Sequence, residues 1–359
     1  MAKIAVRKEM AGVELTKDEF SKRLTRHFYD PAFDALQPEI NKIVDVAWDA
    51  YSDSRKAPRT RKAGAGYADP GYDLSIEWIE ASRAIREAEA RQSDPASLSR
   101  ILLINGATRS EHTCPGETSK TFRLTQDARR IFAAETDFEI DFLDLSRLAS
   151  EYGRIIYPCK TCVSTAMPLC HWPCSCYPNH SLDQVGDWMN EIYPMWAAAH
   201  GIMIVCPVNW YGVPSSLKLM IDRLVCADGG NPDPTSTHGK DAEKAKELEL
   251  ADWPYPRHLA GRVFSVIVHA DSAGAEMVAH GLADWLRDMG LIDAGHKSEL
   301  SSYIGYKRPY ATSHDDLDQD EAVREEVRNA ARALVQAVRL RRSGELEQPD
   351  ADLRDPRPK

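Results

Sequence analysis

The chain has 359 residues, of which 43% are hydrophobic, and its formal net charge at pH 7 is -10. This length allows one large domain with an extension, or two smaller domains. The acidic excess repels phosphate backbones and anionic lipids, so we expect neither a nucleic-acid nor a membrane partner. No stretch is apolar for long enough to cross a bilayer, and the first ten residues lack the apolar core of a targeting peptide. We therefore expect a cytoplasmic protein with reduced thiols.

Residues 1–98 form the first predicted segment, which is polar and helical. Thr16 and Glu19 have the spacing of a capping box ahead of an apolar stripe, and a second amphipathic helix follows. A basic linker that contains Pro and Gly spans residues 55–66, and a third helix is predicted over 74–91. We interpret this segment as a helical N-terminal extension.

From residue 99 to residue 342 apolar strands alternate with amphipathic helices. Strands are predicted within residues 100–105, 138–145, 202–206, 262–269 and 291–306. Because the connections between them are short, this order predicts an α/β domain with a five-stranded parallel sheet wound on both faces. Residues 227–259 form an insertion rich in Gly, Pro, Asp and Lys, and residues 343–359 are expected to be a disordered tail.

A glycine-led loop leaves the first predicted strand and ends where a helix begins. Gly106 turns the chain, and Thr118 and Ser119 place hydroxyl groups at the start of the helix. Backbone N–H groups and the positive end of a helix dipole favour an anion at such a place. The pattern is neither Gly-x-Gly-x-x-Gly nor a Walker A loop, so it suits a single phosphate group. An ordinary capped helix explains the same residues equally well.

Two more loops follow predicted strands. Pro207 ends the strand at 202–206, and an aromatic loop then leads into a helix. A loop of small residues at 270–274 follows the next strand. Since the carboxyl ends of parallel strands meet at one edge, we expect the loops 108–120, 207–213 and 270–274 to lie together there, where open α/β sheets bind ligands.

The stretch at residues 206–223 resembles a motif of the flavodoxin-like NAD(P)H-dependent FMN reductases. It reads Cys-Pro-Val-Asn-Trp-Tyr-Gly-Val-Pro-Ser-Ser-Leu-Lys-Leu-Met-Ile-Asp-Arg, and the resemblance covers residues 100–341. It implies a flavodoxin-like domain that binds FMN, takes hydride from NADH or NADPH, and passes electrons to a small acceptor. The acceptor would be a quinone, a nitroaromatic compound, a flavin or a metal ion. The resemblance also implies a homodimer or a homotetramer.

The same resemblance implies which residues hold FMN. Residues of the first loop would bind its phosphate: Thr108, Arg109, Ser110, Thr118, Ser119 and Lys120. Residues of the second loop would line the isoalloxazine: Pro207, Val208, Asn209, Trp210, Tyr211 and Gly212. The other edge of the ring would be closed by Ser272, Ala273 and Gly274. We nominate no catalytic proton donor, because hydride transfer to a flavin depends on stacking and the cofactor carries the chemistry.

Five cysteines lie within eighteen residues, together with His171 and His180. They are Cys159, Cys162, Cys170, Cys174 and Cys176. This density is typical of metal centres, and it bears some resemblance to the cysteine motif of iron–sulfur flavoproteins. Three interpretations stay open: thiols packed near the flavin, an iron–sulfur cluster, and either zinc or a redox disulfide.

Two functions remain beside that of an enzyme: an iron–sulfur flavoprotein that carries electrons, and a flavin-based redox sensor.

Two further sets of side chains have plain structural explanations. Lys218 and Asp222 have the spacing of an ion pair on a helix surface. His269 is either a hydrogen-bonded core histidine or a neighbour of the flavin.

Overall fold

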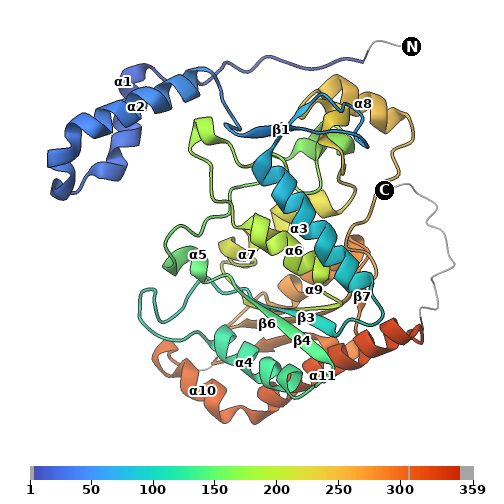
Figure 1. The fold of residues 1–359 in the computed structure, drawn as a ribbon. Coiled ribbons are helices and arrows are strands. Elements are labelled where there is room, and N and C mark those ends of the chain that lie inside the picture. Colours follow the sequence, from blue (N-terminus) through green and yellow to red (C-terminus); the bar gives the residue numbers. More distant parts are fainter. Residues whose placement is uncertain (1–3, 306–307, 348–359) are drawn as a thin grey trace. The chain divides into compact units, whose positions relative to one another are not determined.

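The computed structural model describes residues 4–305 and 308–347 (Figure 1). Its contacts divide the chain into two compact units. The first, which we call the cysteine unit, comprises Met1–Arg83, Tyr157–Trp188 and Gly229–Pro256. The second, the sheet unit, comprises Ala84–Ile156, Met189–Asp228 and Arg257–Lys359. Each unit is therefore assembled from separated segments of sequence.

The sheet unit is built on a parallel sheet of six strands. They are β3 (Ser99–Asn105), β4 (Phe138–Asp144), β5 (Gly201–Pro207), β6 (Val263–Ala270), β7 (Ile292–Asp293) and β8 (Glu299–Tyr303). The order is β4-β3-β5-β6, and both β7 and β8 pair with β6. With β7 and β8 taken as one interrupted strand, this is the 2-1-3-4-5 order of flavodoxin. The predicted flavodoxin-like α/β fold is confirmed.

The strand predicted within 291–306 is divided in two. Asp293 ends β7, because its carboxylate accepts hydrogen bonds from the backbone N–H of Gly295 and from the hydroxyl of Ser298, both at 2.8 Å. Gly295 has a φ of +105°, which a side chain would oppose. A short turn of helix at His296–Ser298 then leads into β8.

Helices cover both faces of this sheet. They are α4 (Lys120–Ala133), α5 (Arg147–Ser150), α6 (Met189–Ala198), α7 (Ser215–Arg223), α9 (Ala275–Asp288), α10 (Ser313–Gln319) and α11 (Glu321–Ser343). On one face α4 and α11 pack on the sheet and on each other, and α6 and α9 lie on the other face (Figure 1). The predicted winding on both faces is thus present.

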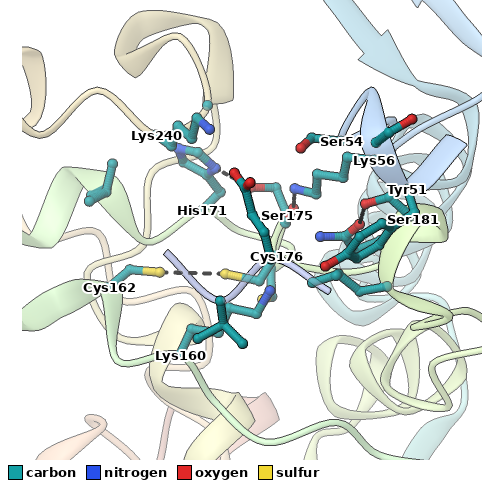
Figure 2. A pocket seen from close by; sticks show the side chains of 18 of the residues that line it. Tyr51, Ser54, Lys56, Lys160, Cys162, His171, Ser175, Cys176, Ser181 and Lys240 are labelled. Atoms are coloured by element: carbon teal, nitrogen blue, oxygen red, sulfur yellow. Dashed lines mark hydrogen bonds between the residues drawn. The ribbon is translucent and has the colours of Figure 1, made fainter. Parts of the chain in front are cut away.

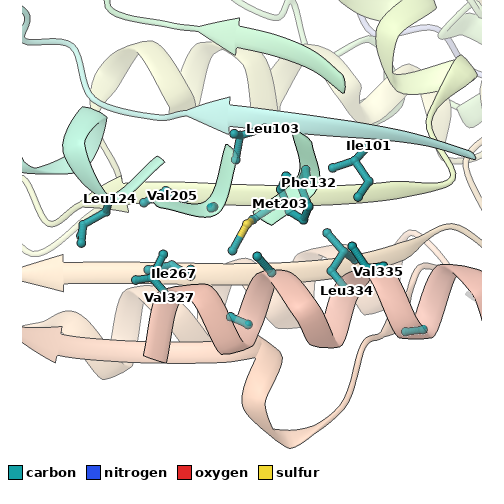
Figure 3. Close-up of a cluster of buried hydrophobic side chains, with 14 of the residues drawn as sticks. Ile101, Leu103, Leu124, Phe132, Met203, Val205, Ile267, Val327, Leu334 and Val335 are labelled. Atoms are coloured by element: carbon teal, nitrogen blue, oxygen red, sulfur yellow. The ribbon is translucent and has the colours of Figure 1, made fainter. Parts of the chain in front are cut away.

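The core under α4 and α11 is a layer of mostly aliphatic side chains, with the phenylalanines Phe132 and Phe138 among them (Figure 3). Ile101 and Met203 project from β3 and β5 against Phe132 of α4 and Leu334 of α11, and all four side chains are fully buried. Burial of such side chains contributes about 1.5–3 kcal/mol each. The parallel register of β3 and β5, with Ile101 opposite Gly201, is fixed by this layer.

The cysteine unit contains less regular structure. Its helices are α1 (Lys17–Leu24), α2 (Gln37–Ser52) and α8 (Ala242–Leu250), and α3 (Ile76–Ser93) begins in this unit and ends in the sheet unit. The capping box of Thr16 and Glu19 is confirmed. The predicted linker contains β1 (Thr60–Lys62), which pairs antiparallel with β2 (Asp73–Ser75).

The domain boundaries predicted at residues 98 and 342 stay predictions, and most of the predicted tail, 348–359, lies outside the described residues. Contacts group the segments 157–188 and 229–256 with the first 83 residues. No helix in the described ranges combines the length and the apolar composition that a bilayer span requires.

Candidate functional site

A cavity of about 260 Å³ lies in the sheet unit, at the carboxyl ends of β3, β5 and β6. Loop residues after these strands line it, and so do residues after β8. The predicted site residues among them are Thr108, Arg109, Ser119, Lys120, Pro207, Val208 and Asn209. The other lining residues are Ala107, Glu117, Thr121, His269, Ala270, Asp271, Tyr310, Ser313 and His314. The remaining predicted residues do not line it: Ser110, Thr118, Trp210, Tyr211, Gly212, Ser272, Ala273 and Gly274.

The first loop leaves β3 in close contact with β5. A Cβ atom at Gly106 would lie 2.7 Å from the Cβ of Cys206, so a larger residue there would push the two segments apart. The backbone N–H of Gly106 donates to the carbonyl of Val205 at 2.8 Å, which holds the loop at the end of β5. Thr108 then shares a hydrogen bond of 2.9 Å with Ser216 at the start of α7.

Helix α4 begins inside the cavity. Ser119 caps it by accepting a hydrogen bond from the backbone N–H of Phe122 at 3.1 Å. Lys120, the first helical residue, is only 10% exposed, and its ammonium lies 2.5 Å from the carboxylate of Asp271. The same ammonium donates to the carbonyl of Ile304 at 3.3 Å. A cation and a helix N-terminus therefore face the same space.

Arg109 adds a second positive charge. One guanidinium nitrogen pairs with Glu117 at 2.8 Å. Its Nε is buried and has no hydrogen-bond partner among the described residues. Leaving a buried donor unpaired costs about 1–3 kcal/mol, and an anion bound in the cavity would remove that cost.

The second loop turns tightly after β5. Asn209 and Gly212 exchange backbone hydrogen bonds of 2.9 and 3.0 Å, and Trp210 and Tyr211 between them have φ angles of 46° and 62°. Positive φ at both central residues is the geometry of a type I′ turn. Trp210 is 99% exposed and Tyr211 is 65% exposed, so the turn presents both rings to the surroundings.

The family model described as NADPH-dependent FMN reductase matches residues 99–302, more than half of the 359 residues. The chain belongs to the NADPH-dependent FMN reductase family. It is accordingly an FMN-dependent NAD(P)H oxidoreductase, as the sequence motif at 206–223 predicted. A search of the curated proteins finds no matching sequence.

This FMN reductase is also similar to solved structures. RosB with a bound 8-demethyl-8-formylriboflavin-5'-phosphate intermediate shares 14% identity, over 69% of this chain and 82% of that one, with a TM-score of 0.46. The azoreductase AzrA shares 12% identity over 65% and 99%, with a TM-score of 0.38. An FMN-dependent NADH-azoreductase from Bacillus anthracis str. Ames Ancestor, in complex with FMN, shares 14% over 66% and 99%, with a TM-score of 0.39.

The donors that line the cavity are of the kind that would hold a phosphate group. Arg109 and Lys120 supply positive charge, and the buried Nε–H of Arg109 has no acceptor among the described residues. Glu117 and Asp271 hold these two cations in the described structure, so a phosphate would have to replace carboxylate partners. The loop 270–274 closes on the second loop, because a Cβ at Gly274 would lie 3.4 Å from Val208.

His269 is both a core residue and a neighbour of the cavity. It is buried, and its Nε2 shares a hydrogen bond of 2.8 Å with the hydroxyl of Thr121. Burial, with the nearby positive charge of Lys120, lowers the pKa of His269 to about 3. The imidazole is therefore neutral near pH 7 and does not serve as a proton donor of the imidazolium type.

Residues 310–314 form a segment of the cavity wall that lies outside the three predicted loops. Tyr310, Ser313 and His314 follow β8, whose carboxyl end lies at the same edge as the other strands. That edge was the available signal, since any loop after a strand of this sheet belongs to it. Lys218 and Asp222, in contrast, form the predicted ion pair on α7.

The cysteine unit does not support the predicted iron–sulfur or zinc centre. Within the described residues, no three His, Cys, Asp or Glu side chains are arranged to hold a metal ion together. The five predicted ligands differ in environment: Cys170 is buried, and the sulfur of Cys159 accepts the backbone N–H of Thr161 at 3.3 Å. Cys162 and Cys176 lie with 3.4 Å between their sulfur atoms, and Cys176 also hydrogen-bonds Cys174.

Proposed function

We propose that this FMN reductase oxidises NADH or NADPH and passes the electrons to a planar aromatic acceptor, a quinone or a nitroaromatic compound. The observation that carries the acceptor class is the turn after β5, where Trp210 is 99% exposed and Tyr211 is 65% exposed. Exposed indole and phenol rings bind flat aromatic compounds by stacking. Free flavin and metal ions are the other acceptors to be compared.

The proposed FMN site uses the three loops at the sheet edge. Arg109 and Lys120 bind the phosphate, and the N-terminus of α4 adds the positive end of its dipole. The other proposed phosphate ligands are Thr108, Ser110, Thr118 and Ser119. The flavin ring is proposed to lie along Pro207, Val208, Asn209, Trp210, Tyr211 and Gly212, with Ser272, Ala273 and Gly274 at its other edge. When bound, FMN supplies the hydride acceptor and the electron carrier.

The chain's own residues have binding roles in this proposal. Lys120 exchanges Asp271 for the phosphate, and Arg109 satisfies its buried Nε on the same group. Trp210 and Tyr211 orient the acceptor, since their turn geometry is set by hydrogen bonds between Asn209 and Gly212. The neutral His269 and its bond to Thr121 hold the wall behind the cavity without exchanging a proton.

Steady-state kinetics of the FMN-loaded protein test the proposal. NADPH and NADH are compared as donors, each with a naphthoquinone, a nitroaromatic compound, free FMN or ferric citrate as acceptor. We expect turnover with the two aromatic classes. For Trp210→Ala we expect the KM for these acceptors to rise about threefold to tenfold, the change that corresponds to the loss of one stacking contact. Protein that takes up no FMN contradicts the site, and turnover with ferric citrate alone contradicts the acceptor class.

The proposal includes a homodimer or homotetramer and a cytoplasmic location. The support for assembly is membership of the NADPH-dependent FMN reductase family, whose members are often oligomeric. Light scattering after size exclusion measures the assembly, and a monomer at all concentrations contradicts it. Cell fractionation tests the location.

A further inference from the structure

A second cavity, of about 600 Å³, lies within the cysteine unit. Segments from all three parts of that unit line it (Figure 2). Four of the five clustered cysteines are on its wall, Cys162, Cys170, Cys174 and Cys176, as are the lysines Lys56, Lys160 and Lys240. The reductase chemistry proposed above uses none of these residues.

Cys162 and Cys176 are placed to react with each other. Their sulfur atoms are 3.4 Å apart and point toward one another at the wall of the cavity (Figure 2). A disulfide requires about 2.05 Å, so small rotations of the two side chains close the bond. Both residues are half-buried, and both are open to the cavity.

The two thiols are not equivalent. The hydrogen bond between them lowers the pKa of Cys162, and the same bond, with burial, raises the pKa of Cys176 to about 11 against the lowering effect of Cys174. Because the thiolate is the nucleophile in disulfide exchange, Cys162 is the attacking sulfur and Cys176 the one that reacts second.

The cavity carries an excess of positive charge. Lys56, Lys160 and Lys240 are all exposed to it, whereas Glu14 is the one carboxylate on the described wall. Lys56 donates to the carbonyl of Ser175, next to Cys176. His171 is buried, bonds to Thr237 at 2.8 Å, and has its pKa lowered by burial to about 4, so it adds no charge near pH 7. Such a surface attracts an anion.

We propose that Cys162 and Cys176 form a redox-active dithiol that reduces a small anionic disulfide bound in this cavity. The thiolate of Cys162 attacks one sulfur of the substrate, forming a mixed disulfide and releasing the first thiol. The sulfur of Cys176 then attacks Cys162, gives up its proton, and releases the second thiol. The protein dithiol loses two electrons and two protons, and the substrate disulfide gains both. An external dithiol reductant restores the starting state.

Peptide mapping of the full-length protein tests the proposal. The reduced protein is incubated with glutathione disulfide, which is anionic, or with cystamine, which is a cationic disulfide, and free thiols are then alkylated. We expect a Cys162–Cys176 disulfide and two thiols released per protein, formed at least about tenfold faster with glutathione disulfide because of the attractive field. Absence of that disulfide, equal rates with the two probes, or stoichiometric zinc or iron on the thiols overturns the proposal.

Variants separate the roles of the two cysteines. Cys176→Ser is expected to accumulate the mixed disulfide with glutathione on Cys162, and Cys162→Ser is expected to lose the capture. Lys240→Ala is expected to slow the reaction of glutathione disulfide and not that of cystamine. Lys42→Ala, on the exposed surface of α2 away from the cavity, is the matched control and keeps both rates. Capture that is unchanged in Cys162→Ser contradicts the assignment even if other variants misfold.

Discussion

In the structure Lys120 pairs with Asp271, whereas the proposed FMN site requires Lys120 to pair with the phosphate. Its ammonium contacts Asp271 at 2.5 Å and is 90% shielded by its surroundings, being 10% exposed. A charge-assisted hydrogen bond of this kind is about twice as strong as a neutral one. At the proposed phosphate site, Asp271 would compete with the phosphate for this cation and would also repel the phosphate.

We expect opposite effects from changing the two partners. Asp271→Asn should lower the Kd for FMN by about threefold to tenfold, since it removes the competing charge and keeps the side-chain shape. Lys120→Ala should raise the Kd by about tenfold to a hundredfold, as for the loss of a charge-assisted hydrogen bond. Quenching of FMN fluorescence measures both. Asp284→Asn, on the exposed surface of α9, is the control, and weaker FMN binding by Asp271→Asn would refute the competition.

His200 links stability to pH in the sheet unit. Its Nδ1 accepts the backbone N–H of Arg100 at 3.0 Å, and its Nε2 donates to the carbonyl of Gln92 at 3.0 Å, so the neutral ring satisfies both contacts. Burial and the nearby Arg342 lower the pKa of His200 to about 4. The unfolded chain, whose histidine has a pKa of about 6.5, therefore binds a proton that the folded chain does not between these two values.

The stability contributed by neutral His200 is complete above about pH 6.5 and is lost as the pH falls toward 4. We expect the free energy of unfolding to drop by up to about 1.4 kcal/mol per pH unit for this residue within that window. Urea unfolding at several pH values measures the slope. His200→Gln should make it shallower, whereas His280→Gln, at an exposed position on α9, should not. An unchanged slope in His200→Gln argues against this linkage.

At the scale of elements, β5 and α11 pack unusually closely. A Cβ atom at Gly201 would lie 2.7 Å from Cγ2 of Val338 and 3.3 Å from Cδ1 of Leu334. Both side chains are buried in the core, where interiors are packed as densely as organic crystals and leave no room to shift. Position 201, at the start of β5, therefore requires glycine because Val338 of α11 occupies the space that a Cβ atom would need.

Gly201→Ala should destabilise the sheet unit by about 1–3 kcal/mol, the cost of overpacking a core. Adding Val338→Ala to it should recover part of the loss, since the second change removes the methyl group that the new Cβ meets. Denaturant unfolding of the two single variants and the double variant measures the coupling. Purely additive effects would mean that the two positions do not touch in the way described.

The elements that the sequence predicted best are those with strong local patterns. The strands β3, β5 and β6 are continuous apolar runs because both faces are covered, and residues such as Leu103 and Val266 are completely buried. The division of the last strand was not predicted, because it depends on the side chain of Asp293 and on the positive φ of Gly295. The pairing of β1 with β2 was also missed, because strands of three residues are too short to show an alternating apolar pattern.

The candidate site was predictable where one loop after a strand carried a distinctive motif. Arg109, Lys120 and Asn209 were named in advance and line the cavity. Asp271 lies in the predicted loop 270–274 but was not nominated as a site residue, and the segment of His314 was not predicted to reach the cavity. Both contributions depend on distances between loops that lie far apart in the sequence. The 3.4 Å contact between Cys162 and Cys176 was not predictable either, since five cysteines allow many pairings and sequence spacing does not choose among them.

At the scale of the whole molecule, the cysteine unit is assembled from three separated segments. Trp78 donates its indole N–H to the carbonyl of Pro173 at 2.9 Å, and Asp233 accepts the backbone N–H of Ala68 at 2.7 Å. The described residues up to Arg83 thus share contacts and hydrogen bonds with the segments 157–188 and 229–256.

A truncation that begins at residue 99 should leave those two segments without their partners. We expect limited proteolysis to cut the truncated protein within 157–188 and 229–256 much faster than the full chain, because exposed loops without packing open readily. Mass spectrometry of the fragments locates the cuts. A truncated protein as resistant as the full chain would show instead that the N-terminal segment is a separate extension.

Because the cysteine unit is built from three separated segments, its parts are translated at different times. The segment up to Arg83 is translated well before residues 229–256, so its packing partners are completed only later. Meanwhile the apolar side chains of Leu74 and Trp78, buried in the finished molecule, have no permanent neighbours. Synthesis of this chain therefore includes an interval in which a nascent surface must be shielded from other polypeptides.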